Sequence, residues 1–199
     1  IKTDRVIGTD VSYYQDAPQT PQGIDFVKMR KHGAAFAIIR AGQNLWVDRD
    51  FKVNWREAKA AGIPRGSYWF YDSRADPKKD NYKGPIAGWK HWYNFIERLK
   101  ELLPSKEDGV YTAFYYWQEN TVSVGIPAAS LNYFKQYPLW VANYGVANPL
   151  VPKPWTTWTL WQFTDNGDGF PYGVESKNID LNYFNGDIED FYQRFGISH

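Results

Sequence analysis

The sequence predicts an α/β protein in which strands and helices alternate through the first half of the chain. Three short runs rich in β-branched and aromatic residues, 6–13, 36–42 and 66–72, are separated by two segments with helical spacing. Such alternation favours parallel strands joined by crossover helices. A chain of 199 residues is long enough to form one core. We therefore predict one domain over residues 1–199, which begins as a wound sheet or a barrel.

Each helix of the first half has a recognisable beginning and end. Asp25 can cap a helix that ends at Gly33, and the apolar run FAIIRAG follows it as a buried strand. Asp50 can cap a second helix, which Gly62 ends ahead of the strand GSYWFYD. The predicted order is therefore strand, helix, strand, helix, strand.

The second half is predicted to contain one long helix, one short helix and four further strands. The segment 88–103 repeats apolar residues at spacings of three and four, which is typical of an amphipathic helix. A strand over 109–117 follows, and then a short helix that begins at Pro127. The last three strands have no helix between them and cover 139–144, 158–164 and 179–184.

The connection between Asp72 and Gly88 is too short for this alternation to continue. A helix, a strand and their loops take roughly 20 to 30 residues, which residues 73–87 cannot hold. Either residues have been left out of the sequence at this point, or the polypeptide lacks one helix and one strand. We favour omission, because loss of a strand from a closed barrel leaves unpaired edges.

Composition and charge exclude several classes of function. The 23 basic and 22 acidic side chains give a net charge of +1, so neither nucleic acid nor an anionic membrane is an expected partner. No apolar run approaches the ~18 residues that a membrane span requires. Without cysteine, and with three scattered histidines, the chain has no metal-ligand spacing. No nucleotide fingerprint occurs, so we expect no cofactor. We likewise expect no metal. For the oligomeric state, a monomer is the default expectation.

Aromatic residues make up 19% of the chain, which is unusually high. Large rings bury much area in a core, and they also stack on the flat faces of sugars in a groove. Composition alone favours both interpretations equally.

Two carboxylates stand inside otherwise apolar strands. Asp10 lies in the first predicted strand and Asp180 in the last. The first and last strands of a closed barrel are neighbours, and barrel chemistry sits at the carboxyl ends of the strands. We therefore expect the two carboxylates side by side at one mouth. A buried acid is costly unless it is paired or hydrogen-bonded, which favours a functional role; the alternative is an acid satisfied by backbone N–H groups or an arginine.

Three other aspartates are better explained by local structure. Asp72 could face the same mouth, but the sequence DSRAD is also a good turn and cap, which we favour. Asp165 and Asp168 stand in TDNGDG, where the glycines indicate a loop. Their spacing does not fit an EF-hand calcium loop.

Several motifs together resemble glycoside hydrolase family 25, the Chalaropsis-type lysozymes of bacteria, fungi and phage endolysins. The resemblance covers nearly the whole chain, and its motifs are specific as a set. In chain order they are VIGTDVSYYQ, AFAIIRAG, GSYWFYD, VYTAFYYW, LWVANY, WTLWQFTDNG and IDLNYFNG.

The resemblance implies a TIM-like flattened barrel of the (β/α)5β3 type. The implied reaction is cleavage of the β-1,4 bond between N-acetylmuramic acid and N-acetylglucosamine in peptidoglycan. It also implies a D-x-E motif at the end of the fourth strand, whose glutamate is the general acid. Residues 73–87 contain no such motif. The missing unit is then the third helix and the fourth strand, and Asp80-Asn81-Tyr82 resembles the stretch that would follow the glutamate.

Under this resemblance Asp10 and Asp180 are the catalytic residues present, as orienting and electrostatic partners of the glutamate. The substrate's own N-acetyl group can serve as the nucleophile. The residues expected to contact sugar, each of which is also suited to a core, are Tyr68, Tyr111, Trp140, Asn143, Tyr144, Trp161 and Gln162.

The implied partner is bacterial peptidoglycan. The protein would act outside the cell at the bacterial wall, or as a phage lysin released from the host cytoplasm. Two alternatives stay open: a peptidoglycan-binding module that has lost the glutamate and does not turn over, and a barrel whose groove holds another glycan.

Overall fold

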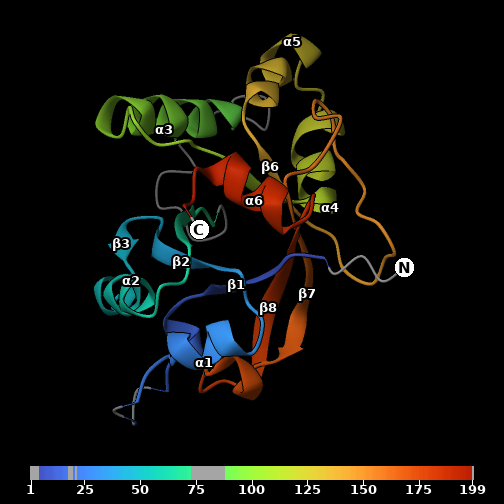
Figure 1. The fold of residues 1–199 in the computed structure, drawn as a ribbon. Helices are drawn as coiled ribbons and strands as arrows, with labels where there is room; N and C mark the ends of the chain where they lie inside the picture. The colour runs from blue at the N-terminus through green and yellow to red at the C-terminus, as the bar shows by residue number, and fades with distance from the viewer. Residues whose placement is uncertain (1–4, 18–19, 21, 73–87, 199) are drawn as a thin grey trace. The chain divides into compact units, whose positions relative to one another are not determined.

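A computed structural model describes residues 5–17, 20, 22–72 and 88–198 of the chain. These residues fall into two compact units, one made by Ile1–Asp76 with Gln162–His199 and the other by Pro77–Trp161. Each unit contains strands and helices (Figure 1), so the predicted α/β class is confirmed.

The first unit contains a mixed sheet with β1 in its interior. β1 (Ile7–Val11) pairs in parallel with β2 (Phe36–Gln43), and β2 pairs in parallel with β4 (Arg65–Phe70). β8 (Asn178–Phe184) pairs with β1 in the antiparallel direction. β7 (Leu160–Asp168) lies beside β8 (Figure 1). The first and last strands are therefore neighbours, as the sequence predicts.

A short strand, β3 (Trp46–Val47), pairs antiparallel with β2 and is absent from the predicted elements. The chain reverses at Asn44, whose φ of 47° is in the left-handed region that asparagine tolerates. The Asn44 side chain accepts a hydrogen bond from the backbone N–H of Asp72 at 2.8 Å and donates one to the backbone carbonyl oxygen of Asp72 at 3.0 Å. This turn thus ties the β2–β3 connection to the end of β4.

The two crossover helices begin where the sequence predicts. The Asp25 side chain caps α1 (Phe26–Lys31) by accepting a hydrogen bond from the N–H of Lys28 at 2.8 Å. Asp50 is the residue before α2 (Phe51–Ala60), but its side chain makes no capping bond, which corrects the predicted role. Its backbone N–H instead donates to the Asp48 side chain at 3.0 Å, so the start of α2 is held by Asp48.

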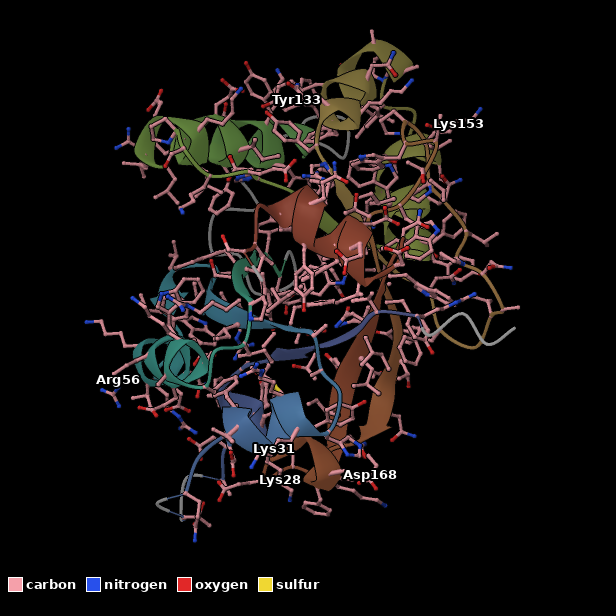
Figure 2. The ribbon with its side chains drawn as sticks, in the orientation of Figure 1. Lys28, Lys31, Arg56, Tyr133, Lys153 and Asp168 are labelled. Atoms are coloured by element: carbon pink, nitrogen blue, oxygen red, sulfur yellow. The ribbon has the colours of Figure 1, made fainter. Side chains whose placement is uncertain are left out.

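Both helices are amphipathic. α1 buries Phe26 and Met29, whereas Lys28 and Lys31 point outward (Figure 2). Arg56 lies on the exposed face of α2 in the same way. The buried faces of both helices pack with residues of β1, β2 and β8 in one core cluster. The members of this cluster are Val11, Ile24, Phe26, Met29, Ala34, Ala37, Ile39, Ala58, Ile63, Tyr172, Val174, Ile179 and Leu181.

The helix α6 (Ile188–Phe195) is also absent from the predicted elements, although both of its ends carry helix signals. Asp187 and Asp190 form a capping box, and Gly196 ends the helix in the left-handed conformation at φ 61°. Phe191 packs on Phe36 and Phe184, with ring centroids 5.2 and 5.3 Å apart. This aromatic group covers the amino-terminal part of β2.

The second unit begins with α3 (Trp89–Leu102), as predicted. β5 (Val110–Ala113) pairs in parallel with β6 (Leu139–Ala142). The predicted strand over 109–117 is wrong in its second half, because the chain turns helical at Phe114. Local β-propensity of aromatic residues is outweighed here by packing.

Trp117 explains this turn. Its ring is 2% exposed, and its indole N–H donates to the carbonyl oxygen of Lys153 at 2.6 Å. The rings of Trp92, Phe134 and Trp155 lie around it, with centroids 5.4, 5.5 and 4.7 Å away. These four rings form core, which is one of the two interpretations that composition left open.

The helix predicted to begin at Pro127 is present as α5 (Ala128–Leu131), followed by a 3₁₀ turn over Asn132–Gln136. Between residues 139 and 184, all of which the structure describes, the only helical element is a 3₁₀ turn over Phe170–Tyr172. The prediction of three final strands without α-helices between them is thus confirmed. No helix in the described part of the chain is long and apolar enough to cross a membrane.

The predictions about the Asp72–Gly88 connection fall on residues 73–87, which lie outside the described residues. The 199-residue sequence runs through this connection without interruption. The expectation that residues have been left out there stays a prediction.

Candidate active site

Asp10 and Asp180 are direct partners in the antiparallel pairing of β1 with β8. Asp10 is only 4% exposed and occupies the second-last position of β1, while Asp180 is half-buried near the start of β8. Side chains of directly opposed residues lie on the same face of a sheet. The predicted adjacency of the two carboxylates is therefore confirmed.

Two buried amides bind the carboxylates. The side-chain nitrogen of Gln162 donates to Oδ2 of Asp10 at 2.8 Å and approaches Oδ2 of Asp180 at 3.3 Å. The side-chain nitrogen of Asn182 donates to the same Oδ2 of Asp10 at 2.8 Å. Gln162 is a predicted site residue, and Asn182 is one that the sequence reasoning missed. The alternation of side chains along IDLN could have found it, because residues 180 and 182 share one face of the strand.

These contacts make the two carboxyl groups unequal. Burial raises the pKa of Asp10, and the hydrogen bonds from Asn182, Gln162 and Asp180 offset part of that rise. Burial also raises the pKa of Asp180 to about 8, with further contributions from the charge of Asp10, the hydrogen bond to it and the charge of Asp165. Both pKa values are thus raised, and at neutral pH the pair holds a proton in the hydrogen bond between Asp180 and Asp10.

Tyr68, a predicted sugar-binding residue, lies close enough to the carboxyl pair for the charges of Asp10 and Asp180 to act on its hydroxyl. It lies on β4 as the pairing partner of Arg40 on β2. Burial raises the pKa of the Tyr68 hydroxyl, the charge of Asp10 raises it further, and the charge of Arg40 offsets part of the effect. The hydroxyl therefore stays protonated and can donate a hydrogen bond.

Arg40 is a buried cation that the sequence analysis did not single out. Its Nε donates to Oδ2 of Asp48 at 2.9 Å, and the two side chains are 5% and 1% exposed. The signal was present, because an arginine interrupts the apolar run FAIIRAG. A buried arginine needs a partner, but its identity depends on the β2–β3 turn, which was not predicted.

The other predicted sugar-binding residues belong to the second unit. Tyr111 and Trp140 are pairing partners on β5 and β6, and their rings meet edge to face at 4.5 Å. Trp140 is buried at 8% exposure, so most of its area serves packing.

Three further predicted residues lie at the carboxyl end of β6. Asn143 and Tyr144 directly follow the strand, and Trp161 contacts Asn143. Asn143 is buried, its Oδ1 accepts from the N–H of Leu150 at 2.9 Å, and its carbonyl oxygen accepts from the indole of Trp161 at 2.8 Å. Trp161 is likewise buried, whereas Tyr144 is 42% exposed. Asn143 and Trp161 therefore hold the loop after β6, and Tyr144 has the ring most open to a ligand.

The three aspartates assigned to local structure are placed as follows. The backbone of Asp72 is held by the Asn44 side chain, which agrees with a turn at this position. Asp165 is exposed and acts on the carboxyl pair through its charge, because it helps to raise the pKa of Asp180. Asp165 and Asp168 both lie within β7, so the loop predicted for TDNGDG is wrong at these positions; Asp168 is exposed at the end of the strand (Figure 2).

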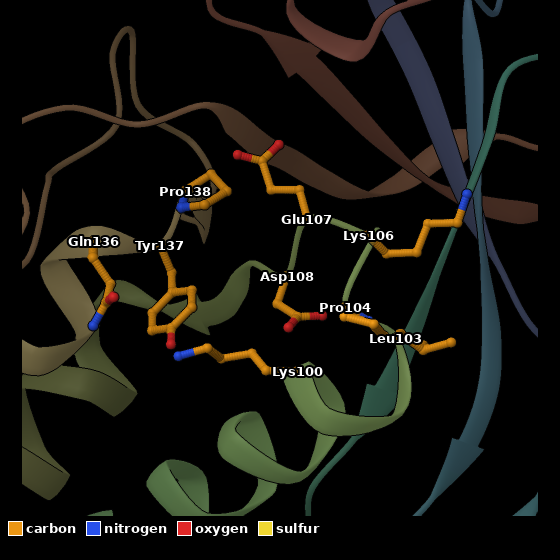
Figure 3. Close-up of a pocket in the computed structure, with 9 residues that line it drawn as sticks. All are labelled: Lys100, Leu103, Pro104, Lys106, Glu107, Asp108, Gln136, Tyr137 and Pro138. Atoms are coloured by element: carbon orange, nitrogen blue, oxygen red, sulfur yellow. The ribbon is translucent and has the colours of Figure 1, made fainter.

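The second unit also has a pocket of about 410 Å³ at the end of α3. Figure 3 shows Lys100 directed toward Tyr137 from one side of this pocket, with the Asp108 carboxylate nearby and Lys106 pointing away. Two of its lining residues, Asp108 and Pro138, come shortly before β5 and β6 in the sequence. The pocket therefore lies at the amino-terminal ends of these strands. Asn143 and Tyr144 follow β6 at the opposite end. Among the described side chains, no group of three or more histidine, aspartate or glutamate residues is arranged to hold a metal ion.

Comparison with solved structures defines the class of fold. The chain is similar to a bacterial lysozyme from Streptomyces coelicolor with a TM-score of 0.73, at 24% identity, over 98% of this chain and 100% of the other. It is similar to a muramidase from Trichobolus zukalii with the same TM-score of 0.73, at 22% identity, over 97% of this chain and 100% of the other. The fold is thus that of these lysozyme structures.

Sequence comparison defines the family. The profile of Glycosyl hydrolases family 25 matches residues 9–91 and 86–169, and the chain belongs to this family. Among curated relatives, Lysozyme M1 of Streptomyces globisporus is 28% identical over 219 residues, which covers 92% of this chain and 69% of the relative. An alignment longer than this whole chain means that the relative has positions without a counterpart here. This agrees with the prediction that the 199-residue sequence lacks a unit, by omission or by deletion.

Proposed function

We propose that this protein is a peptidoglycan hydrolase of the muramidase type, which cleaves the β-1,4 bond between N-acetylmuramic acid and N-acetylglucosamine. Membership of Glycosyl hydrolases family 25 supports glycoside hydrolysis as the class of reaction. The observation that carries the finer proposal is the Asp10–Asp180 pair, which holds one proton between two carboxyl groups. In this proposal residues 1–199 form one catalytic domain on the (β/α)5β3 plan.

A glycosidase needs an acid that protonates the leaving oxygen and a second group that stabilises the oxocarbenium-like centre. Asp180 can supply the proton, because its pKa of about 8 keeps it protonated at neutral pH. Asp10 suits the second role, because two amides donate to its Oδ2 and favour the carboxylate. The sequence has no glutamate between Glu57 and Glu97, so an acid has to come from elsewhere.

The proposed reaction has two steps, the formation of a cyclic intermediate and its hydrolysis. The proton moves from Asp180 to the glycosidic oxygen, and the bond from that oxygen to the sugar C1 breaks with its electron pair on the leaving oxygen. The acetamido oxygen of the same sugar attacks C1 and forms a cyclic intermediate. Water then adds at C1, returns its proton to Asp180 and restores the acetamide. Asp10 stays ionised throughout and stabilises positive charge on the sugar.

The alternative is a peptidoglycan-binding module without turnover. It is favoured by one observation, the absence of D-x-E from residues 73–87, where the resemblance places the general acid. Both functions share the same partner, the bacterial wall, which the protein would reach by secretion or by release from a lysed host. A monomer suffices for either.

One experiment separates the two functions. Purified peptidoglycan is incubated with the protein, and new reducing ends are counted while the bound protein is measured by cosedimentation. A muramidase produces reducing ends on N-acetylmuramic acid, and Asp180→Asn lowers their rate of formation by roughly 10²- to 10⁴-fold, the usual contribution of a general acid. Asp168→Asn is the matched control, because Asp168 is exposed and outside the pair.

Cosedimentation without reducing ends would establish the binding module and overturn the enzyme. Protein that neither binds nor cleaves peptidoglycan would overturn both functions. An unchanged rate in Asp180→Asn would remove the proton donor from the mechanism while leaving the muramidase.

A further inference from the structure

An exposed aromatic cluster stands beyond the carboxyl ends of β1 and β2. We call Tyr13, Tyr14 and Trp46 the aromatic platform. The ring centroids of Tyr13 and Tyr14 are 4.2 Å apart, and those of Tyr13 and Trp46 are 6.0 Å apart. Tyr14 is 63% exposed and Trp46 is 40% exposed. Rings that are grouped and left in water contribute little to a core, and such groups mark binding surfaces.

A buried cation holds the platform from beneath. The Arg40 guanidinium carbon lies 4.8, 5.2 and 5.1 Å from the ring centroids of Tyr13, Tyr14 and Trp46. Arg40 is 4% exposed, and its Nη2 makes no hydrogen bond to any residue that the structure describes. In addition to its ion pair with Asp48, the guanidinium is therefore stabilised by attraction to the electron-rich ring faces. The Arg49 guanidinium carbon also lies 4.7 Å from the ring centroid of Tyr13, so Tyr14 and Trp46, the two exposed rings, are the ones left open to a ligand.

Asp48 fixes the cation and the platform to the sheet. Its Oδ2 accepts from Arg40 Nε at 2.9 Å and from the backbone N–H of Tyr13 at 3.2 Å. Ser12 and Gln15 form a capping box around the short 3₁₀ turn that carries both tyrosines. The rings are thus held before any ligand arrives, and preorganised contacts lose less entropy on binding.

The platform is connected to the carboxyl pair through β1 and Arg40. Asp10 precedes Tyr13 by three residues in the sequence; Asp10 lies near the carboxyl end of β1 and Tyr13 follows that end. Arg40 pairs with Tyr68, whose hydroxyl senses the charges of both Asp10 and Arg40. A glycan strand whose scissile bond lies at Asp10 and Asp180 would place its neighbouring sugar rings on the surface around the pair. The platform follows β1 within a few residues of Asp10 and can provide such a surface.

We infer that Tyr14 and Trp46 form a sugar-stacking subsite that binds a ring of the glycan strand next to the bond to be cleaved, with Arg40 as the positioning residue. This inference rests on the proposed function. A neutral sugar face is the fitting ligand, because Arg40 is buried and paired with Asp48, and Arg49, which lies over Tyr13, is paired with Asp50. Flat C–H faces of a pyranose match the flat ring faces of tyrosine and tryptophan.

The test measures binding of soluble peptidoglycan glycan chains, from which the peptide stems have been removed, by calorimetry. Tyr14→Ala and Trp46→Ala are each expected to raise Kd about three- to tenfold, the range of an aromatic stacking contact. Trp46→Phe keeps a ring and should retain most of the affinity. Phe170→Ala is the control, since Phe170 is a 55% exposed ring outside the platform, and should leave Kd unchanged.

Arg40→Lys tests the positioning role. It keeps the charge and loses the planar group, so Kd should rise while the number of binding sites per protein stays at its wild-type value. A general loss of folding would instead lower that number. An unchanged Kd in Arg40→Lys would remove Arg40 from the inference.

The possible failures are distinguishable. If the wild type binds neither glycan chains nor whole peptidoglycan, the proposed function fails. If the wild type binds and both alanine variants bind equally well, the subsite alone is wrong. Competition by free stem peptides, rather than by N-acetylglucosamine oligosaccharides, would also overturn the subsite, because the platform would then recognise peptide.

Discussion

Asp10 and Asp180 oppose each other across the β1–β8 pairing, and the amide nitrogen of Gln162 reaches both carboxyl groups. Two carboxylates this close cannot both ionise easily in a buried site, so one of them keeps its proton. The second amide, from Asn182, is directed to Asp10 and not to Asp180. The extra amide donor favours the ionised form of Asp10, and it opposes the burial that raises the pKa of this carboxyl group.

The first prediction concerns pH and activity. In the proposed mechanism Asp180 has to be protonated, so the rate of wall cleavage should fall as pH rises through about 8. The measurement is the rate of reducing-end formation on purified peptidoglycan from pH 5 to 10. A rate that keeps rising above pH 9 would show that the proton comes from another group.

The second prediction concerns pH and stability. The folded-state pKa of Asp180 is raised from 3.8 to about 8, so the folded protein binds a proton that the unfolded chain has already released over this interval. The contribution of this group to stability is thus fully present below pH 4, decreases as pH rises from about 4 to 8, and is constant above that. The free energy of unfolding should decrease accordingly, measured by denaturant titration at pH 4.5, 6, 7.5 and 9.

Asp180→Asn provides the comparison for this slope. The variant cannot ionise at this position, so its free energy of unfolding should depend less steeply on pH between 4.5 and 7.5 than that of the wild type. Asp168→Asn, at an exposed position, should retain the wild-type slope. Equal slopes in all three proteins would contradict the raised pKa.

The third prediction concerns Asn182. Asn182→Ala removes one of the two donors to Asp10 Oδ2 inside a fully buried site, which should destabilise the fold by about 1 to 3 kcal/mol. It should also lower the cleavage rate, because an Asp10 with one donor fewer is more easily protonated. Denaturant unfolding and peptidoglycan cleavage measure the two effects. Asn178→Ala, at an exposed position on the same strand, should change neither.

How far the sequence predicts this site depends on how local each signal is. The pairing of Asp10 with Asp180 could be predicted, because closure of a barrel is a rule about the first and last strands and both aspartates stand in clear strand patterns. The start of α1 could be predicted from Asp25 for a similar reason. These signals lie within a few residues of the feature that they describe.

Other features escaped because they depend on contacts between distant residues. The strand expected over 109–117 turns helical at Phe114, since Trp117 is drawn into a core of rings from three other segments. β3 has two residues, too few to show any alternation. Without β3 there is no reason to place Trp46 beside Arg40, so the platform could not be read from the sequence. α6, by contrast, carried a capping box and a terminal glycine and was predictable.

The fourth prediction compares two ion pairs of the first unit. The Arg40–Asp48 pair is buried, and Asp48→Ala leaves the guanidinium without its carboxylate, which should cost about 3 to 5 kcal/mol. The Arg56–Glu57 pair is exposed on α2, where Glu57→Ala should cost roughly 0 to 1 kcal/mol. Thermal unfolding of both variants measures the difference. Similar losses would show that the buried pair has no special role in stability.

The fifth prediction concerns the core of the second unit. Trp117→Phe keeps a ring but loses the indole N–H that donates to the Lys153 carbonyl oxygen at 2.6 Å. The loss should be about 1 to 3 kcal/mol, because that carbonyl group is left without its buried donor. Tyr115→Phe, two residues away at a 62% exposed position, should change stability by less than about 0.5 kcal/mol. Denaturant unfolding followed by tryptophan fluorescence measures both, and equal effects would contradict the assignment of Trp117 as the centre of this aromatic core.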